Sequence, residues 1–177
     1  MAKKACLFCD KEADKLEHLW PHWILRRVGM KPIRQKFGKR PAKVIPHSWL
    51  EIRCVCEKDC NNGWMADLEK ENVPIIGEMM ENRSLTLDAA QQSSLVAWAM
   101  KTAMVLDAVN VKSRGRFYTR EECAALRLHR SIPAQTYIWI GGYSDSGYSA
   151  DGTIVTLDLA NAPKIAKASV STFVPKL

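Results

Sequence analysis

Two pairs of closely spaced cysteines lie on either side of an acid–histidine dipeptide in the first third of the chain. Cys6 and Cys9 form the first pair, and Cys56 and Cys60 form the second. Thiolates are favoured ligands of structural Zn²⁺, which takes four ligands in a tetrahedron. The four cysteines therefore predict one structural zinc site that joins two distant segments. Cys54 lies close enough in sequence to compete as a ligand.

The dipeptide Glu17-His18 offers the two side chains that metal-assisted hydrolysis needs. An imidazole can take a proton from water at neutral pH, and a carboxylate can hold a hard divalent ion such as Mg²⁺ or Mn²⁺. Asn61 follows the last cysteine and offers an uncharged oxygen ligand, which a zinc ion on Cys60 would fix in place. Neighbours on an extended strand point to opposite faces, so convergence of Glu17 and His18 requires a bend there.

Basic residues without acidic neighbours fill the segment between the two halves of this site. The chain has a formal net charge of +7, and no Asp or Glu occurs from His18 to Leu50. Cations that neutralise phosphates release counterions and supply most of the non-specific affinity for nucleic acid. We therefore expect this segment to contact DNA, with a solvated basic loop as the alternative. The predicted contacts are Arg26, Arg27, Lys36, Lys39 and Arg40.

The segments around the site have recognisable local patterns. Residues 20–29 carry apolar side chains at helical spacing, which predicts a helix. Residues 30–47 contain three prolines and a glycine, which predict a loop. Residues 49–55 alternate as a strand does, leading into the second cysteine pair. A helix capped near Asn61 is expected to run to about Glu71, with a new element starting at Pro74.

The second half of the chain predicts two helices and a small sheet. Asp88 with Gln91, and Thr119 with Glu122, have the spacing of capping boxes. They predict a long helix from 88 and a shorter one ending near Leu128. β-branched and aromatic residues between glycine-rich turns predict antiparallel strands. These strands are expected at 136–140, 152–157 and 166–173.

The motifs of the first half resemble the HNH endonucleases, in the zinc-knuckle branch of the ββα-metal (His-Me finger) class. The resemblance covers about residues 6–70 and rests on the cysteine pairs together with EHLWP at 17–21 and CNNGWM at 60–65. It implies a hairpin and helix around one divalent ion, with His18 as the general base on water. Glu17 and Asn61 would hold the ion, which would stabilise the leaving 3′ oxygen of a cleaved phosphodiester.

Three departures from the family pattern bear on this comparison. The second cysteine pair has three intervening residues instead of two, so Asn62 is an alternative to Asn61 as the ligand. The middle asparagine of the pattern is absent ahead of Cys54, where His47 or Ser48 would have to substitute. The chain also ends soon after the last predicted strand, which suggests a shortened version of the family pattern.

The sequence as a whole predicts an α+β protein: a zinc-stapled ββα module at 1–80, followed by an extension at 81–177 with helices and a small antiparallel sheet. Its 47% hydrophobic content suits a globular core, and it shows no signal segment or membrane-spanning run. We expect a cytoplasmic, metal-dependent DNA endonuclease, with a homodimer as an open question. The alternatives are an inactive zinc module that binds nucleic acid or protein, and a structural zinc-ribbon subunit.

Overall fold

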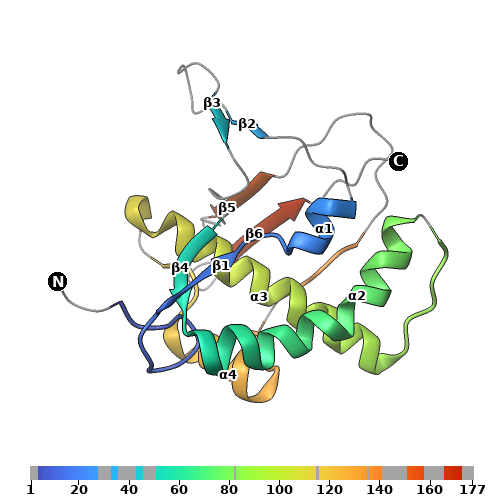
Figure 1. The fold of residues 1–177 in the computed structure, drawn as a ribbon, viewed down its shortest axis with the longest axis horizontal. Helices are drawn as coiled ribbons and strands as arrows, with labels where there is room; N and C mark the ends of the chain where they lie inside the picture. Colours follow the sequence, from blue (N-terminus) through green and yellow to red (C-terminus); the bar gives the residue numbers. More distant parts are fainter. Residues whose placement is uncertain are drawn as a thin grey trace.

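The computed structural model describes residues 4–27, 33–35, 43–45, 51–81, 83–114, 116–134, 136–140, 151–157 and 166–172. Helices and short antiparallel strand pairs occur together in this part of the chain, which confirms the predicted α+β class (Figure 1). The elements in chain order are β1 (Lys15–His18), α1 (His22–Arg27), β2 (Ile33–Gln35), β3 (Lys43–Ile45), β4 (Glu51–Val55), η2 (Glu57–Met65), α2 (Ala66–Met80), α3 (Ala89–Arg114), α4 (Arg120–His129), β5 (Asp151–Leu157) and β6 (Ala166–Thr172).

Two strands and a helix form the N-terminal unit. β1 pairs antiparallel with β4, and the register places Glu17 opposite Ile52 and His18 opposite Glu51. β4 leads through Cys56 into η2, a widely wound helical segment with a kink at Gly63, and α2 follows directly. This strand–strand–helix order brings both cysteine pairs and the acid–histidine dipeptide into one unit.

The predicted break at Pro74 is wrong, because α2 continues through this residue to Met80. Proline in a helix interior removes one backbone hydrogen bond and crowds the preceding turn. Here the helix buries Leu68, Ile75 and Ile76 on either side of the proline. Tertiary packing of this apolar face compensates for the local cost of the proline.

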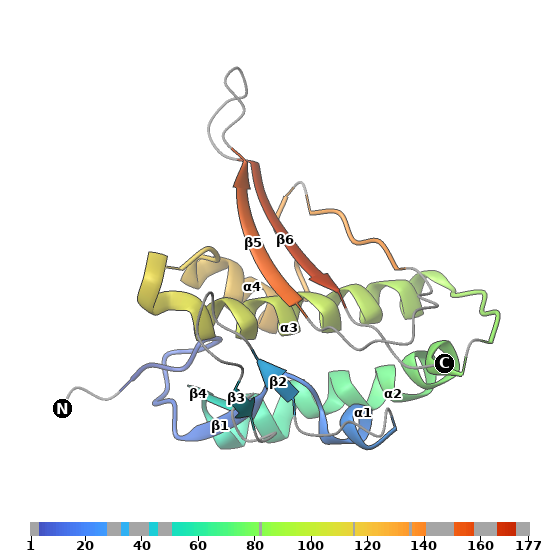
Figure 2. The ribbon, with the colours of Figure 1, turned by 90° about the horizontal axis from the view of Figure 1, so that it is seen from above.

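The long helix α3 lies between the N-terminal unit and the remaining helix and strands (Figure 2). Both predicted capping boxes are present at the starts of α3 and α4. Asp88 and Gln91 exchange two backbone–side-chain hydrogen bonds of 3.0 and 2.8 Å, and Thr119 and Glu122 form the equivalent pair. α3 contacts β4, α2 and α4, so it connects the two halves of the chain.

A single cluster of buried side chains extends through both halves, from Cys6 in the first knuckle to Leu126 in α4. It includes Phe8, whose ring meets Trp64 edge-on at 5.0 Å, and the apolar side chains of α2 and α3. One continuous core joins the parts of the chain before and after residue 80. The predicted division into 1–80 and 81–177 stays a prediction. None of the described helices combines the length and apolar character that crossing a membrane requires.

The weaker strand and loop predictions have mixed outcomes. β5 and β6 pair antiparallel as expected, but β2 and β3 form a short pair inside the predicted loop at 30–47. Residues 136–140 are not in a strand, although their composition favours one. Tyr137 and Trp139 there are 72% and 84% exposed and stack on each other. Strand propensity alone does not supply the partner strand that a sheet requires.

We predict that Leu68→Ala lowers the free energy of unfolding by about 2 to 5 kcal/mol, because it removes a side chain that is only 1% exposed. Urea denaturation measures the change. Lys70→Ala, on the exposed side of the same helix, should shift stability by no more than about 0.5 kcal/mol. Equal effects of the two substitutions would contradict the assigned core.

Candidate functional site

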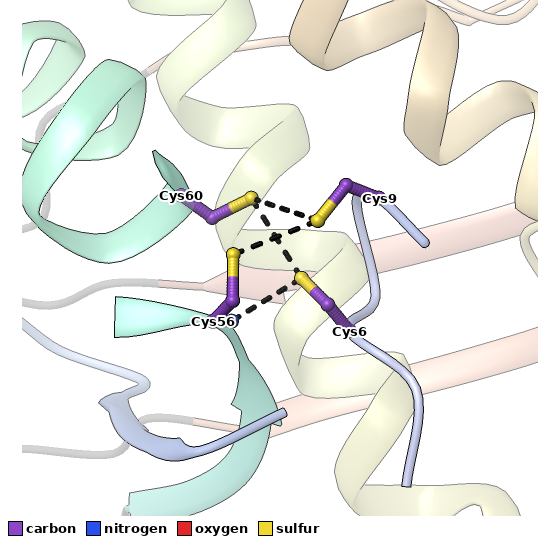
Figure 3. Close-up of side chains that lie close together, drawn as sticks. All are labelled: Cys6, Cys9, Cys56 and Cys60. Carbon is purple, nitrogen blue, oxygen red and sulfur yellow. Dashed lines mark hydrogen bonds between the residues drawn. The ribbon is translucent and has the colours of Figure 1, made fainter. Parts of the chain in front are cut away.

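The four predicted cysteine ligands come together with their sulfurs facing one another (Figure 3). All four Sγ atoms lie within 4.8 Å of one another. Sγ–Sγ distances are 3.7 Å for Cys6–Cys60, 3.5 Å for Cys9–Cys56 and 3.7 Å for Cys9–Cys60. Four thiolates at about 2.3 Å from a tetrahedral zinc ion lie about 3.8 Å apart. The cluster can therefore hold a metal ion such as zinc.

Backbone hydrogen bonds shape the first cysteine pair into a tight knuckle. The Cys6 amide donates to the Lys11 carbonyl at 2.8 Å, and Ala5 bridges to Glu12. The Leu7 amide donates to the Cys54 carbonyl at 2.7 Å, which fixes the knuckle against β4.

The second cysteine pair and the C-terminal half of the chain also form hydrogen bonds around the sulfur cluster. The Cys56 amide donates to the Cys6 sulfur at 3.3 Å, and the Asn61 amide donates to the Cys56 carbonyl at 3.0 Å. Arg120, at the start of α4, donates to the Cys9 carbonyl at 2.9 Å. Both halves of the chain therefore hold the sulfurs in place.

The sulfurs interact strongly with one another. Hydrogen bonding from Cys60 lowers the pKa of the Cys6 thiol to about 4, whereas burial raises the pKa of the Cys9 thiol to about 11. Thiols this close to one another gain and lose protons as a group, because the charge on one sulfur affects the others.

Cys54 and Cys123 lie outside the cluster, as expected for thiols that are not ligands. Both are fully buried, and burial raises the pKa of each to about 12. Within the described part of the chain, the sulfur cluster consists of the other four cysteines. Cys54 does not replace any of them.

Glu17 and Asn61, two of the three predicted catalytic residues, line one open cavity of about 340 Å³. Glu17 reaches it from β1, and Asn61 reaches it from η2, immediately after the metal-cluster cysteine Cys60. Asn62 also lines the cavity, so the lining does not distinguish between the two asparagines that the sequence offered. The complete lining is Glu17, Asn61, Asn62, Met65, Ala66, Glu69, Lys70 and Val73.

The Glu17 carboxylate is largely buried and has a buried cationic partner. Glu17 is 7% exposed, and its Oε1 lies 3.4 Å from Nζ of Lys101, which is 1% exposed. Burial raises the pKa of the Glu17 carboxyl, while the charge of Lys101 acts in the opposite direction. The negative charge of Glu69, which also lines the cavity, makes a smaller contribution that raises the pKa further.

His18 does not line the cavity. Glu17 and His18 are both paired in regular register with β4, so the bend that would turn them to one face is absent. His18 Nε2 instead lies 2.5 Å from Oε1 of Glu51, directly across the strand pair. The ring of His22 is 4.1 Å from that of His18, between ring centres. The carboxylate and the imidazole therefore lie on opposite sides of β1.

The predicted DNA contacts are only partly within the described structure. Arg26 and Arg27 are exposed at the end of α1, and Arg27 forms an ion pair with Glu81. Lys36, Lys39 and Arg40 lie outside the described residues. Arg26 thus offers an exposed cation at the end of α1.

Three residues at the site were not found by sequence reasoning: Lys101, Glu69 and Glu51. Glu69 and Glu51 resemble ordinary surface acids in the sequence, and only the fold brings them to Glu17 and His18. Lys101 carries a faint signal, because it is a lone cation within the otherwise apolar and small-residue run Leu95–Leu106.

Comparisons of this chain with protein-family models, with curated proteins and with solved structures find no match.

We predict that Cys56→Ala abolishes retention of one zinc ion per chain, because it removes one of the four sulfurs. Cys54→Ala is the matched control, since both thiols are buried in neighbouring positions but only Cys56 belongs to the cluster. Zinc content measured after dialysis should fall close to zero for Cys56→Ala and stay near one for Cys54→Ala. Equal retention by the two variants would refute the assigned ligand set.

Proposed function

We propose that this protein is a divalent-metal-dependent endonuclease of the HNH type that hydrolyses DNA phosphodiester bonds. The observation that supports it most is that Glu17 and Asn61, which are 44 residues apart in sequence, line one cavity, and that His18 follows Glu17 directly on β1. Carboxylate and amide oxygens are suitable ligands for Mg²⁺ or Mn²⁺. The neighbouring Cys₄ cluster fits zinc as a structural ion, which would hold the Asn61 segment against β1.

The opposite directions of Glu17 and His18 are compatible with phosphodiester hydrolysis. In an in-line displacement, the attacking and leaving oxygens lie on opposite sides of the phosphorus atom. A divalent ion at the cavity would polarise the phosphate and stabilise the leaving 3′ oxygen. A phosphate lying across the end of β1 would then have the metal ligands on one side and the imidazole of His18 on the other.

His18 is suited to act as the general base in this arrangement. Its Nε2 lies 2.5 Å from the Glu51 carboxylate, which orients the ring. When Nε2–H donates to the carboxylate, the lone pair on Nδ1 is available to accept a proton from water. A side chain exposure of 30% leaves the imidazole accessible to solvent and substrate.

Charge supports a nucleic acid as the substrate. The chain has a net charge of +7, and the sequence between Glu17 and Glu51 contains Lys and Arg residues but no Asp or Glu. This segment follows β1, which carries Glu17 and His18, and precedes β4, which carries Glu51. A substrate phosphate at the end of β1 would therefore lie next to the basic segment.

The second candidate is a zinc-containing module that binds nucleic acid or protein without catalysis. One observation favours it: two of the three proposed catalytic residues already have a charged partner, Lys101 for Glu17 and Glu51 for His18. Such pairs also occur in purely structural networks. This candidate predicts salt-sensitive DNA binding without cleavage in any divalent metal.

We predict that His18→Ala lowers the rate of plasmid cleavage in Mg²⁺ or Mn²⁺ by about 100-fold or more, since a general base contributes about 10² to 10⁴. Glu17→Gln should lower cleavage as well, by weakening the metal site. His129→Ala, an exposed histidine at the end of α4, is the control and should cut at the wild-type rate. Unchanged cleavage by His18→Ala would remove the proposed base, and absence of cleavage by the wild type would favour the second candidate.

A further inference from the structure

We propose that Lys101 of α3 is a positioning residue that holds the Glu17 carboxylate at the cavity, so that the C-terminal half completes the divalent-metal site. This inference rests on the proposed function, because it concerns the same carboxylate. It assigns a role to α3, which lies outside the segment that resembles the HNH family.

The burial of Lys101 is the first observation. Its side chain is almost completely enclosed, and the ion pair with Glu17 is 3.4 Å long. A lysine is rarely buried without a partner, because loss of hydration strongly disfavours an isolated charge. The Trp98 ring, with its centre 5.9 Å from Nζ, adds a weaker cation–π contact. The pair therefore constrains both side chains.

The face of α3 around Lys101 offers no comparable alternative for the ammonium group. Ala97, Met104, Val105 and Ala108 lie one or two helical turns away on the same side, and all are buried. Packing of this apolar face fixes the helix against its neighbours and so fixes the position of Nζ. Lys101 thereby holds the Glu17 carboxylate of β1 in a fixed position relative to α3.

The direction of the contact leaves Glu17 available to a metal ion. Glu17 lines the cavity and Lys101 does not. Nζ therefore approaches the carboxylate from the protein interior, and it is Oε1 that Nζ contacts. The other oxygen can face the cavity, where Asn61 and Glu69 provide further oxygen atoms. An outer partner that orients a ligand in this way commonly strengthens metal binding.

Mn²⁺ binding to the full-length, zinc-loaded protein tests this role without relying on cleavage. Loss of the free Mn²⁺ signal in electron paramagnetic resonance gives the affinity for the wild type, Glu17→Gln, Lys101→Met and Lys101→Arg. Thr102→Val is the matched control, since Thr102 is also buried on α3 and its hydroxyl donates to the Trp98 carbonyl of its own helix.

We expect Lys101→Met to weaken Mn²⁺ binding by about 10- to 100-fold, as is typical when a partner of a metal ligand is removed. Glu17→Gln should lose the site, and Thr102→Val should bind as the wild type does. Lys101→Arg keeps the charge with a different shape, so its affinity should lie between those of Lys101→Met and the wild type. The Lys101→Arg variant also tests the inference if Lys101→Met retains no zinc or does not fold.

Two results would overturn the inference in distinguishable ways. In the first, Lys101→Met and Lys101→Arg bind Mn²⁺ within twofold of the wild type while Glu17→Gln does not bind it. The ion pair would then be purely structural, and the proposed metal site would stand. Mn²⁺ binding that is absent in the wild type, or unaffected by Glu17→Gln, would remove the metal role of Glu17 and the role of Lys101 with it.

Discussion

Contact among four cysteine sulfurs, three of them on buried residues, is the constraint on which the rest of this structure depends. Cys6 and Cys60 are 54 residues apart in sequence, yet their sulfurs lie 3.7 Å apart. The contact fixes the first knuckle to the start of the helix, and so sets Asn61 relative to the strand that carries Glu17. Structural zinc ions contribute on the order of 10 kcal/mol to small folds. An ion at this cluster would stabilise a unit whose strands are too short to be stable alone.

The C-terminal half contributes directly to this arrangement. Arg120 of α4 bonds the Cys9 carbonyl behind one knuckle, and Lys101 of α3 meets Glu17 behind the cavity. Both contacts join a cation from the second half to a group next to the candidate site. The continuous core from Cys6 to Leu126 has the same consequence, because movement of α3 would disturb the packing beneath the site.

Sequence patterns predicted the features whose causes are local or chemical. Thiol spacing identified the cluster, and the capping box at Thr119 marked the start of α4. Features that arise from tertiary contacts were missed or misjudged. Pro74 suggested a break, but packing maintains the helix there. Lys101 pairs with Glu17, which is 84 residues away in sequence. The opposite directions of Glu17 and His18 follow from regular pairing with β4, which a single sequence does not reveal.

Zinc K-edge X-ray absorption of the purified full-length protein tests the central claim most directly, because it reports the atoms around the metal. The account predicts one zinc ion per chain surrounded by four sulfurs at about 2.3 Å. Zinc bound mainly by nitrogen or oxygen, or a folded protein that retains no metal, would contradict it.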